Sequence, residues 1–208
     1  TPSDTSSVES STVVSAEQLE MLPVGRDISD VALLAPGTVR GDSGFGNLAS
    51  FGGSSVAENA YYVNGFNITN SFNNLAFAQI PFEAIAEQQV KTGGYGAEFG
   101  RSTGGVVNLI TRRGTNDFSA GGAIYWTPSS LAGKTPDVHL NNGDLLQDNS
   151  QDEAAQSSVA LWAGGALMRD RLFAYGLVQF ARNEADAWGD VNAGINTNTR
   201  TRSPSWLL

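Results

Sequence analysis

The side chains that could perform chemistry in this sequence are few and lie far apart. The chain has no cysteine and a single histidine, His139. Without thiols, the chain has no disulfide framework and no thiolate metal site, and a lone histidine in a polar stretch is usually a solvated side chain. Gly94-Tyr95-Gly96 with Gly100 lacks both the glycine spacing of a dinucleotide loop and the Gly-Lys-Ser/Thr of a phosphate loop. We therefore predict a protein that is not an enzyme and needs no cofactor.

Four carboxylates in one polar stretch are the remaining candidates for a metal site. Asp144, Asp148, Asp152 and Glu153 offer the oxygen ligands that calcium prefers. They lack the alternate spacing and the central glycine of a known calcium loop. A solvated charged face is the simpler interpretation, so we predict no metal site.

Two polar stretches are candidates for contact with a ligand. Thr38 to Ser55 is rich in glycine, serine and asparagine and is predicted to be a surface loop. Its Arg40-Gly41-Asp42 resembles an adhesion tripeptide, but three residues recur by chance. Asn70 to Gln79 sets asparagine amides beside aromatic side chains such as Phe72. This second stretch is either a site for a polar ligand or a plain surface loop.

The charge and hydropathy of the chain limit its partners and its class. Its net charge is -9, with 21 acidic and 12 basic residues, which argues against a nucleic-acid partner because phosphate binding needs clustered Lys and Arg. No run of about 18 apolar residues is present for a transmembrane helix. Strands of a β-barrel remain possible, since each needs only about 9–11 residues of weak alternation.

The first third of the chain predicts a tether followed by two short helices. Thr1 to Thr12 is rich in serine and threonine and is expected to be flexible. Ser15 and Gln18 have the spacing of a capping box, so a helix should begin there. Asp27 is the expected cap of a second helix over residues 28–35, which Pro36-Gly37 ends.

The middle of the chain predicts strands around a tight turn. Apolar residues flank Asn64-Gly65, and both residues of a type I′ turn need positive φ, so residues 60–68 should form a β-hairpin. A further strand is expected around Glu87 to Lys91. Val106 to Thr111 is apolar, β-branched and bounded by glycines, which is typical of a short buried strand.

The glycine-dense stretch Gly93 to Gly105 is predicted to be a loop or a close backbone approach, because residues without Cβ lose much backbone entropy on ordering. Its only large side chains are two aromatics, Tyr95 and Phe99, and an opposite-charge couple, Glu98 and Arg101. We expect these four residues to hold the segment in place.

The last part of the chain has the pattern of outer-membrane strands. Residues 118–127 alternate between apolar and smaller or more polar side chains, with aromatics near one end. Two apolar stretches, residues 157–168 and 172–183, are joined only by Arg169-Asp170-Arg171, and residues 203–208 would begin a fourth strand. Short turns at one end and long polar loops at the other are typical of outer-membrane barrels.

The stretch Ile80 to Phe118, IPFEAIAEQQVKTGGYGAEFGRSTGGVVNLITRRGTNDF, resembles the end of the plug domain of TonB-dependent outer-membrane receptors, in particular the Oar-like, OmpA-related branch. The Leu-Pro-x-Gly-Arg-Asp at residues 22–27 is similar to the opening of the same plug. In most plugs an arginine precedes a glycine before the next strand, whereas here Phe51 precedes Gly52. The resemblance implies an α+β plug domain followed by the first antiparallel strands of a transmembrane β-barrel.

This resemblance divides the chain into a tether (1–12), a plug domain (13–114) and the first three to four strands of an incomplete barrel (115–208). Three or four amphipathic strands cannot close, and an open edge leaves backbone groups unpaired in lipid. We therefore expect the chain to be part of a longer protein, whose barrel would have about 22 strands around a plugged lumen.

The resemblance implies a receptor in the bacterial outer membrane whose plug gates energised uptake of a substrate. Its partners would be TonB of the inner-membrane energising complex, outer-membrane lipid and a substrate of open identity, since members of the family take up metal chelates, cobalamin, sugars or peptides. The segment that docks TonB is not recognisable here. The residues expected to contact the substrate are Arg40, Asp42, Phe45, Asn47, Asn67, Asn70, Asn73 and Asn74. The structural clamp of the plug would comprise Tyr95, Glu98, Phe99 and Arg101.

Two alternatives from other classes remain open at this point. One is a soluble secreted β-rich adhesion or carbohydrate-binding module that uses the same aromatic and asparagine loops. The other is a segment bound within a larger surface assembly.

Overall fold

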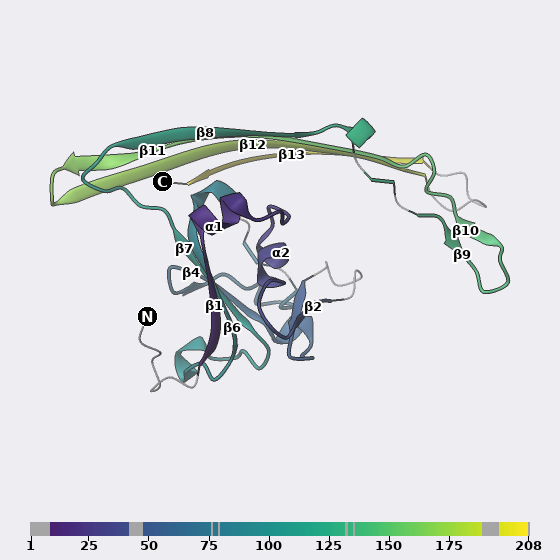
Figure 1. Cartoon of the computed structure of the whole chain (residues 1–208), viewed down its shortest axis with the longest axis horizontal. Coiled ribbons are helices and arrows are strands. Elements are labelled where there is room, and N and C mark those ends of the chain that lie inside the picture. The colour runs from purple at the N-terminus through teal and green to yellow at the C-terminus, as the bar shows by residue number, and fades with distance from the viewer. Residues whose placement is uncertain are drawn as a thin grey trace. The chain divides into compact units, whose positions relative to one another are not determined.

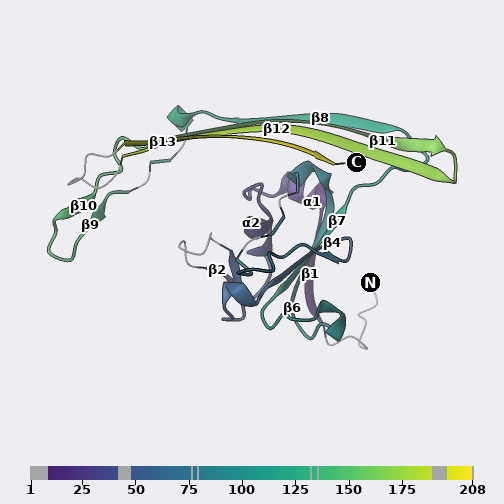
Figure 2. The ribbon, with the colours of Figure 1, turned by 180° about the vertical axis from the view of Figure 1, so that it is seen from behind.

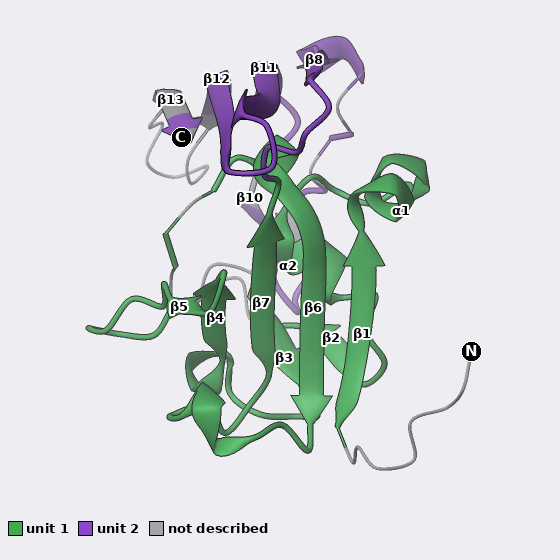
Figure 3. Cartoon of the chain, turned by 90° about the vertical axis from the view of Figure 1, so that its left-hand side faces the viewer, with its two compact units in different colours: residues 1–112 green, residues 113–208 purple. Residues whose placement is uncertain are grey.

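The computed structural model of the chain describes residues 9–41, 48–75, 77–78, 80–131, 133–134, 136–188 and 196–207. It divides into two compact units, unit 1 up to Arg112 and unit 2 from Arg113 onward, which Figure 3 shows in green and purple. Within the described residues, none of the helices has the length and apolar character needed to cross a membrane.

Unit 1 is built from short helices and strands. In chain order its elements are β1 (Ser10–Ser15), α1 (Ala16–Met21), α2 (Ile28–Ala32), β2 (Thr38–Arg40), β3 (Ala49–Phe51), the 3-10 turn η2 (Val56–Glu58), β4 (Ala60–Val63), β5 (Phe66–Asn67), η3 (Phe82–Ala84), β6 (Ile85–Gly93), η4 (Ala97–Phe99) and β7 (Val106–Thr111).

The two helices begin at the residues that the sequence predicts. The Ser15 hydroxyl accepts the backbone N–H of Gln18, and the Gln18 side chain accepts the backbone N–H of Ser15, which completes the capping box. The Asp27 carboxylate accepts a backbone N–H of α2 at 2.7 Å. α2 ends at Ala32, before the expected boundary, because the next residues close a tighter turn in which the N–H of Ala35 donates to the carbonyl of Ala32.

A five-stranded mixed sheet organises unit 1, in the order β1-β6-β7-β4-β5 (Figure 3). β7 lies antiparallel to β6 and parallel to β4. The predicted hairpin is confirmed as β4 and β5, and both turn residues have positive φ, 49° at Asn64 and 85° at Gly65. β6 extends two residues further at each end than predicted.

The main core lies on one face of this sheet, beneath α2 and the β2–β3 pair, which share that side in Figures 1 and 2. Tyr61 of β4 stacks on Phe77 with ring centroids 4.2 Å apart. Gln88 is completely buried in β6, and its amide nitrogen donates to the carbonyl of Ile28 at 2.8 Å, which ties α2 to the sheet. The buried apolar members of this core are Ile28, Ala32, Ala35, Leu48, Ala49, Phe51, Val56, Tyr61, Phe77, Ile85, Val90, Val107 and Leu109.

The prediction of a surface loop from Thr38 to Ser55 is wrong in part. β2 and β3 form an antiparallel pair within this stretch, with Thr38 opposite Phe51. Leu48, Ala49 and Phe51 are buried in the main core. Strands of three residues are too short to show alternation, so glycine and serine dominated the sequence pattern.

Unit 2 contains β8 (Ser119–Thr127), η5 (Ser129–Leu131), β9 (Val138–His139), β10 (Leu145–Gln147), β11 (Glu153–Met168), β12 (Leu172–Trp188) and β13 (Asn196–Leu207). Four long strands form one antiparallel sheet in the order β13-β12-β11-β8. The strands predicted from residues 118, 157, 172 and 203 onward are all present. β11, β12 and β13 are longer than predicted.

The two ends of this sheet differ, as the pattern of short and long connections predicted. At one end, Arg169 to Arg171 joins β11 to β12 directly. At the other end, the connection from β8 to β11 carries the β9–β10 hairpin, which projects beyond the long strands in Figure 1. The sequence did not predict this hairpin, because its strands have only two and three residues.

One face of the unit 2 sheet presents large apolar side chains. Ile124, Val159 and Phe180 lie directly opposite one another on three adjacent strands, and they are 77%, 40% and 63% exposed. Leu161 and Trp126 lie on the same face, at 63% and 74%. A contiguous exposed apolar face of this kind is suited to lipid.

Candidate functional site

The glycine-rich segment covers the face of the unit 1 sheet opposite the main core. Successive residues of a strand point to opposite faces, so Tyr62 and Val106 face this segment while their neighbours face α2. The Phe99 ring meets Tyr62 edge-on with centroids 5.3 Å apart, and Tyr95 meets Phe99 at 6.2 Å. The Lys91 ammonium lies 4.9 Å from the centre of the Phe99 ring. The two aromatic residues predicted to hold the segment therefore close a separate small core on this face of the sheet.

Hydrogen bonds fix the end of this segment to η2. The Tyr95 hydroxyl donates to the carbonyl of Gly104 at 2.7 Å. The Ser102 hydroxyl lies 3.2 Å from the carbonyl of Glu58 and 3.0 Å from that of Gly105. The backbone N–H of Gly104 donates to the same Glu58 carbonyl at 3.1 Å. The loop is therefore held by its backbone as well as by its rings.

Asn59 joins three parts of unit 1 and was not singled out from the sequence. Its side chain is buried, donates to the carbonyl of Ala49 at 2.6 Å and accepts the N–H of Gly105 at 3.1 Å. A Cβ on Gly105 would lie 2.3 Å from the Phe51 ring, and a Cβ on Gly104 would lie 2.7 Å from the Asn59 side-chain oxygen. These two glycines therefore let the start of β7 pack directly on the core of its own unit.

The charged half of the expected clamp is not formed. Glu98 and Arg101 are both exposed, and no described hydrogen bond or ion pair joins them. Arg101 has a φ of 71°, a conformation that favours glycine. The structure thus places the two charged residues on the surface of the segment, whose attachment comes from the two aromatic rings and the hydrogen bonds to η2.

A partly buried ion pair absent from the sequence analysis connects the start of α2 to η3. The Arg26 guanidinium lies 2.8 Å from a carboxylate oxygen of Glu83, whose side chain is 4% exposed, and 4.7 Å from the centre of the Phe82 ring. The partners are 57 residues apart, so no local pattern could reveal the pair.

The first group of expected substrate contacts is only partly described. The Arg40 guanidinium pairs with Asp30 of α2 at 2.5 Å, and the Arg40 side chain is 53% exposed. Asp42, Phe45 and Asn47 lie outside the described residues.

The second group forms one continuous turn after β5. The side-chain oxygens of Asn67, Asn70 and Asn73 each accept the backbone N–H two residues later, at 2.8, 2.8 and 3.0 Å. Asn74 has a φ of 56°. Phe72 beside them is 94% exposed. The asparagines thus shape a loop that presents an aromatic ring and amide groups.

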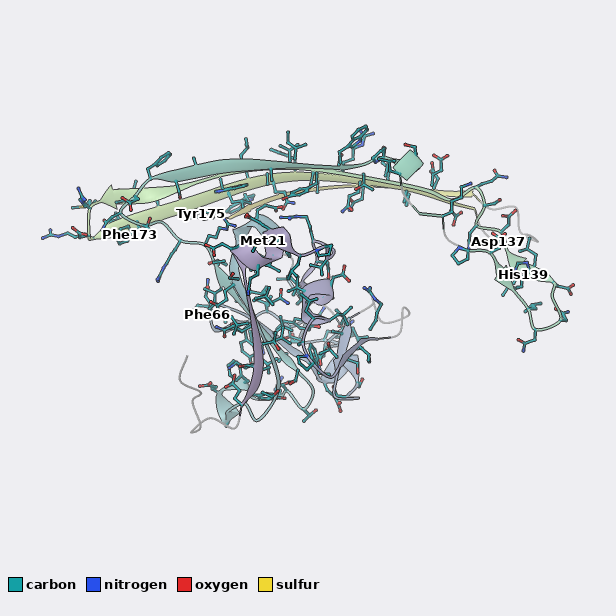
Figure 4. All side chains as sticks on the ribbon, in the orientation of Figure 1. Met21, Phe66, Asp137, His139, Phe173 and Tyr175 are labelled. Carbon is teal, nitrogen blue, oxygen red and sulfur yellow. The ribbon has the colours of Figure 1, made fainter. Side chains whose placement is uncertain are left out.

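The polar stretch around His139 contains a short hairpin and local hydrogen bonds. His139 is exposed in β9 and lies in the hairpin with Asp137 (Figure 4). The Asp148 carboxylate accepts the N–H of Ser150 at 2.9 Å, and hydrogen bonds from Ser150 lower the pKa of Asp148 below its usual value. Among the described residues, no group of three or more His, Cys, Asp and Glu side chains is placed to hold a metal ion.

Comparison with known families identifies the fold. A family model of the TonB-dependent receptor plug domain matches residues 3–107, just over half of the chain. The chain belongs to the TonB-dependent receptors. The predicted fold class, a mixed plug sheet with short helices followed by antiparallel strands, is confirmed. The receptors of this family reside in the bacterial outer membrane and are not enzymes, and both statements hold for this chain.

Two named relatives are similar over most of this chain. The TonB-dependent transporter Oar of Myxococcus xanthus is 31% identical over 148 residues, which cover 71% of this chain and 13% of Oar. A probable TonB-dependent siderophore receptor, PirA of Acinetobacter baumannii, is 30% identical over 159 residues, covering 65% of this chain and 21% of PirA. The chain thus spans about an eighth to a fifth of the length of these relatives.

A solved structure with the same fold is the outer-membrane transporter YddB of Escherichia coli. It superposes with a TM-score of 0.72 at 20% identity, over 95% of this chain and 30% of YddB. Membership in this family replaces the alternative of a soluble adhesion or carbohydrate-binding module.

Proposed function

We propose that this chain is the plug and the first barrel strands of a TonB-dependent transporter, in which the plug gates energised uptake of a substrate. One observation carries the proposal: a sheet of the plug family leads within a few residues into long antiparallel strands with an exposed apolar face. The division between the two units at Arg112 and Arg113 supports a plug that ends close to the predicted boundary at Gly114, with barrel strands following it. β1 begins at Ser10, inside the predicted tether of residues 1–12, so the tether that precedes the plug would end before Ser10.

We place the action of TonB at the segment before the plug. β1 follows that segment directly and, among the described strands, is an edge strand that pairs with β6. An ion pair between Glu9 and Lys91 adds to this attachment. Force applied to the tether would therefore load the β1–β6 pairing before any other strand.

Substrate contact would fall on the loops at residues 40–47 and 67–74. The stretch from Asn59 to Gln79 has no charged side chain, in a chain of net charge -9. Exposed Phe72 and the neighbouring asparagine amides offer apolar contact and neutral hydrogen bonds to a solute. The role of Tyr95 and Phe99 would be to keep the plug sheet covered while these loops exchange ligand.

Uptake experiments in cells that carry the full-length receptor test this function. A panel of ferric chelates, cobalamin, oligosaccharides and peptides is supplied with and without active TonB. One class of solute should enter only when both receptor and TonB are present. Absence of such uptake for every class, together with failure of the receptor to bind the periplasmic domain of TonB, would overturn the proposal.

A pair of variants then tests whether the loop at residues 67–74 contacts the substrate. Phe72→Ala should raise the concentration of that solute needed for half-maximal uptake, because a fully exposed ring in the contact loop is lost. Met21→Ala removes a side chain that is also exposed, at 77%, but lies on α1, away from the Phe66 hairpin (Figure 4). Met21→Ala should leave uptake unchanged, and equal effects of the two variants would rule out a specific role for the loop.

A further inference from the structure

The segment that follows Arg113 is packed into the first long hairpin of unit 2. Gly114 is buried. A Cβ on Gly114 would lie 2.3 Å from the carbonyl oxygen of Ala174 and 2.8 Å from that of Gly165. Both are backbone atoms of paired strands, since Gly165 of β11 lies opposite Ala174 of β12. The chain can therefore cross this hairpin only because residue 114 is glycine.

Two residues further on, a side chain continues the attachment. The Asn116 amide nitrogen donates to the Asp170 carboxylate at 2.5 Å, and the Asp170 backbone N–H donates to the Asn116 side-chain oxygen at 2.8 Å. Asp170 is the central residue of the three-residue turn between β11 and β12, with a φ of 59°. One asparagine thus binds both the backbone and the side chain of a turn residue 54 positions away.

The end of the segment also meets this hairpin. A Cβ on Gly165 would lie 3.3 Å from the Phe118 ring and 3.4 Å from the Phe118 Cα. Phe118 immediately precedes β8, which pairs with β11 along its length. The segment is therefore held at its start, middle and end by a hairpin that follows it in sequence.

We propose that Gly114, Asn116 and the β11–β12 hairpin form an anchor that stays closed when the plug sheet opens. This inference rests on the proposed function. It defines which residues of the plug rearrange: the rearrangement would include β7 and stop at Gly114. The reason is that the contacts named above all join groups of unit 2. The plug would thus keep a fixed end at the first barrel hairpin while its other end is displaced.

Hydrogen exchange of the full-length receptor in lipid nanodiscs, followed by mass spectrometry at increasing urea, tests the anchor. Amides of β6 and β7 report on the plug, and those of residues 114–118 and of the turn at Asp170 report on the anchor. In the wild type, the anchor amides should remain protected at urea concentrations at which β6 and β7 exchange fully. Loss of protection in both groups at the same urea concentration would overturn the proposal.

Matched variants separate the two parts of the anchor. Asn116→Ala should speed exchange at Asp170 by about tenfold, because one hydrogen bond to that N–H is lost. Asn142→Ala removes a similar amide that pairs locally with Asp144, through bonds of 2.7 and 3.1 Å. Asn142→Ala should leave exchange at Asp170 unchanged, and a tenfold effect from it would contradict the assignment.

In Gly114→Ala, the anchor amides should lose protection from exchange at the same urea concentration as the amides of β7. The reason is that the added Cβ would meet two backbone oxygens. Gly133→Ala is the control, because nothing lies within 4 Å of a Cβ at that position. If Gly114→Ala does not assemble, the wild type and Asn116→Ala still decide the question. None of these measurements uses TonB or a solute, so a failure of TonB-dependent uptake would refute the proposed function and leave the anchor standing.

Discussion

The two units of this chain use apolar side chains in opposite ways. In unit 1, apolar residues of the sheet, of α2 and of the β2–β3 pair are buried against one another in one cluster. In unit 2, the largest apolar side chains of one sheet face are exposed, Ile124 at 77% and Leu161 at 63%. Unit 1 thus buries its apolar side chains in its own core, whereas this face of unit 2 leaves large apolar side chains exposed, an arrangement typical of a lipid-facing surface.

This difference indicates that different interactions stabilise the two units. The plug depends on close packing, and Gly104 and Gly105 mark places where no additional atom fits. The strands of unit 2 depend on backbone pairing and on the medium around them. Substitutions should therefore act through packing in unit 1 and through polarity in unit 2, and four predictions test this contrast.

The largest effect is expected from a charge on the apolar face of unit 2. Leu161→Arg should destabilise the receptor in a bilayer by about 3 kcal/mol, because a guanidinium at the lipid face is costly. The urea midpoint of the full-length receptor in phospholipid bilayers measures this change. Gln179→Arg places the same charge on the other face of the sheet and should cost far less. Equal costs for the two variants would mean that the exposed apolar face does not meet lipid.

A smaller effect is expected from one methyl group in unit 1. Gly105→Ala should destabilise the plug by about 2 kcal/mol, because its Cβ would lie 2.3 Å from the buried Phe51 ring. The urea dependence of exchange at the amides of β7 measures the change. At Gly100 the nearest contact of an added Cβ is 3.6 Å away, so Gly100→Ala should stay within about 0.5 kcal/mol of the wild type. A tolerated Gly105→Ala would show that the packing of β7 on Phe51 can relax.

The third prediction concerns high pH. Burial raises the pKa of Tyr61 to about 12 from an ordinary value of 10.0, so folding favours the neutral phenol. This contribution is fully present below pH 10 and is lost as the pH rises from 10 to 12. The plug should be about 1.4 kcal/mol less stable at pH 11 than at pH 8 on this account. Denaturation curves of the wild type and Tyr61→Phe at both pH values measure it, and the variant should lose less stability; an identical loss would exclude Tyr61 as its source.

The smallest effect on stability is expected at Arg101, where two variants distinguish the contribution of the backbone conformation from that of the charge. Arg101→Gly should stabilise the plug by about 0.5 kcal/mol, because glycine adopts the φ of 71° at this position without strain. Arg101→Ala keeps the strained backbone and should match the wild type within a few tenths of a kcal/mol. Thermal unfolding of the plug measures both. Similar destabilisation by both variants would indicate that Arg101 contributes through its charge, as the sequence first suggested.

Much of the local structure could be predicted from neighbouring residues. The capping box at Ser15, the cap at Asp27, the type I′ turn at Asn64-Gly65 and the strand Val106 to Thr111 were all correct. Each depends on side chains within a few positions of one another, so the sequence carries the whole signal. The β2–β3 pair was missed, because its two short strands hold too few residues for a periodic pattern.

The candidate site was harder to predict for the same reason. The sequence analysis named Tyr95 and Phe99 as residues that hold the glycine-rich segment, and the structure places both rings in one contact cluster with Tyr62. It also paired Glu98 with Arg101, which the structure leaves apart. Opposite charges close in sequence do not form an ion pair when a turn directs them into solvent.

By itself the sequence determined the caps, the turns, the identity of the long strands and the family. Only the tertiary structure decided that Asn59 binds Gly105, that Phe51 fills the space beside Gly105, and that Asn116 binds Asp170. These contacts join residues 46 to 54 positions apart. They exist because β4 lies parallel to β7 and because a later hairpin packs on the residues before β8, and strand order of this kind is not encoded by any local pattern.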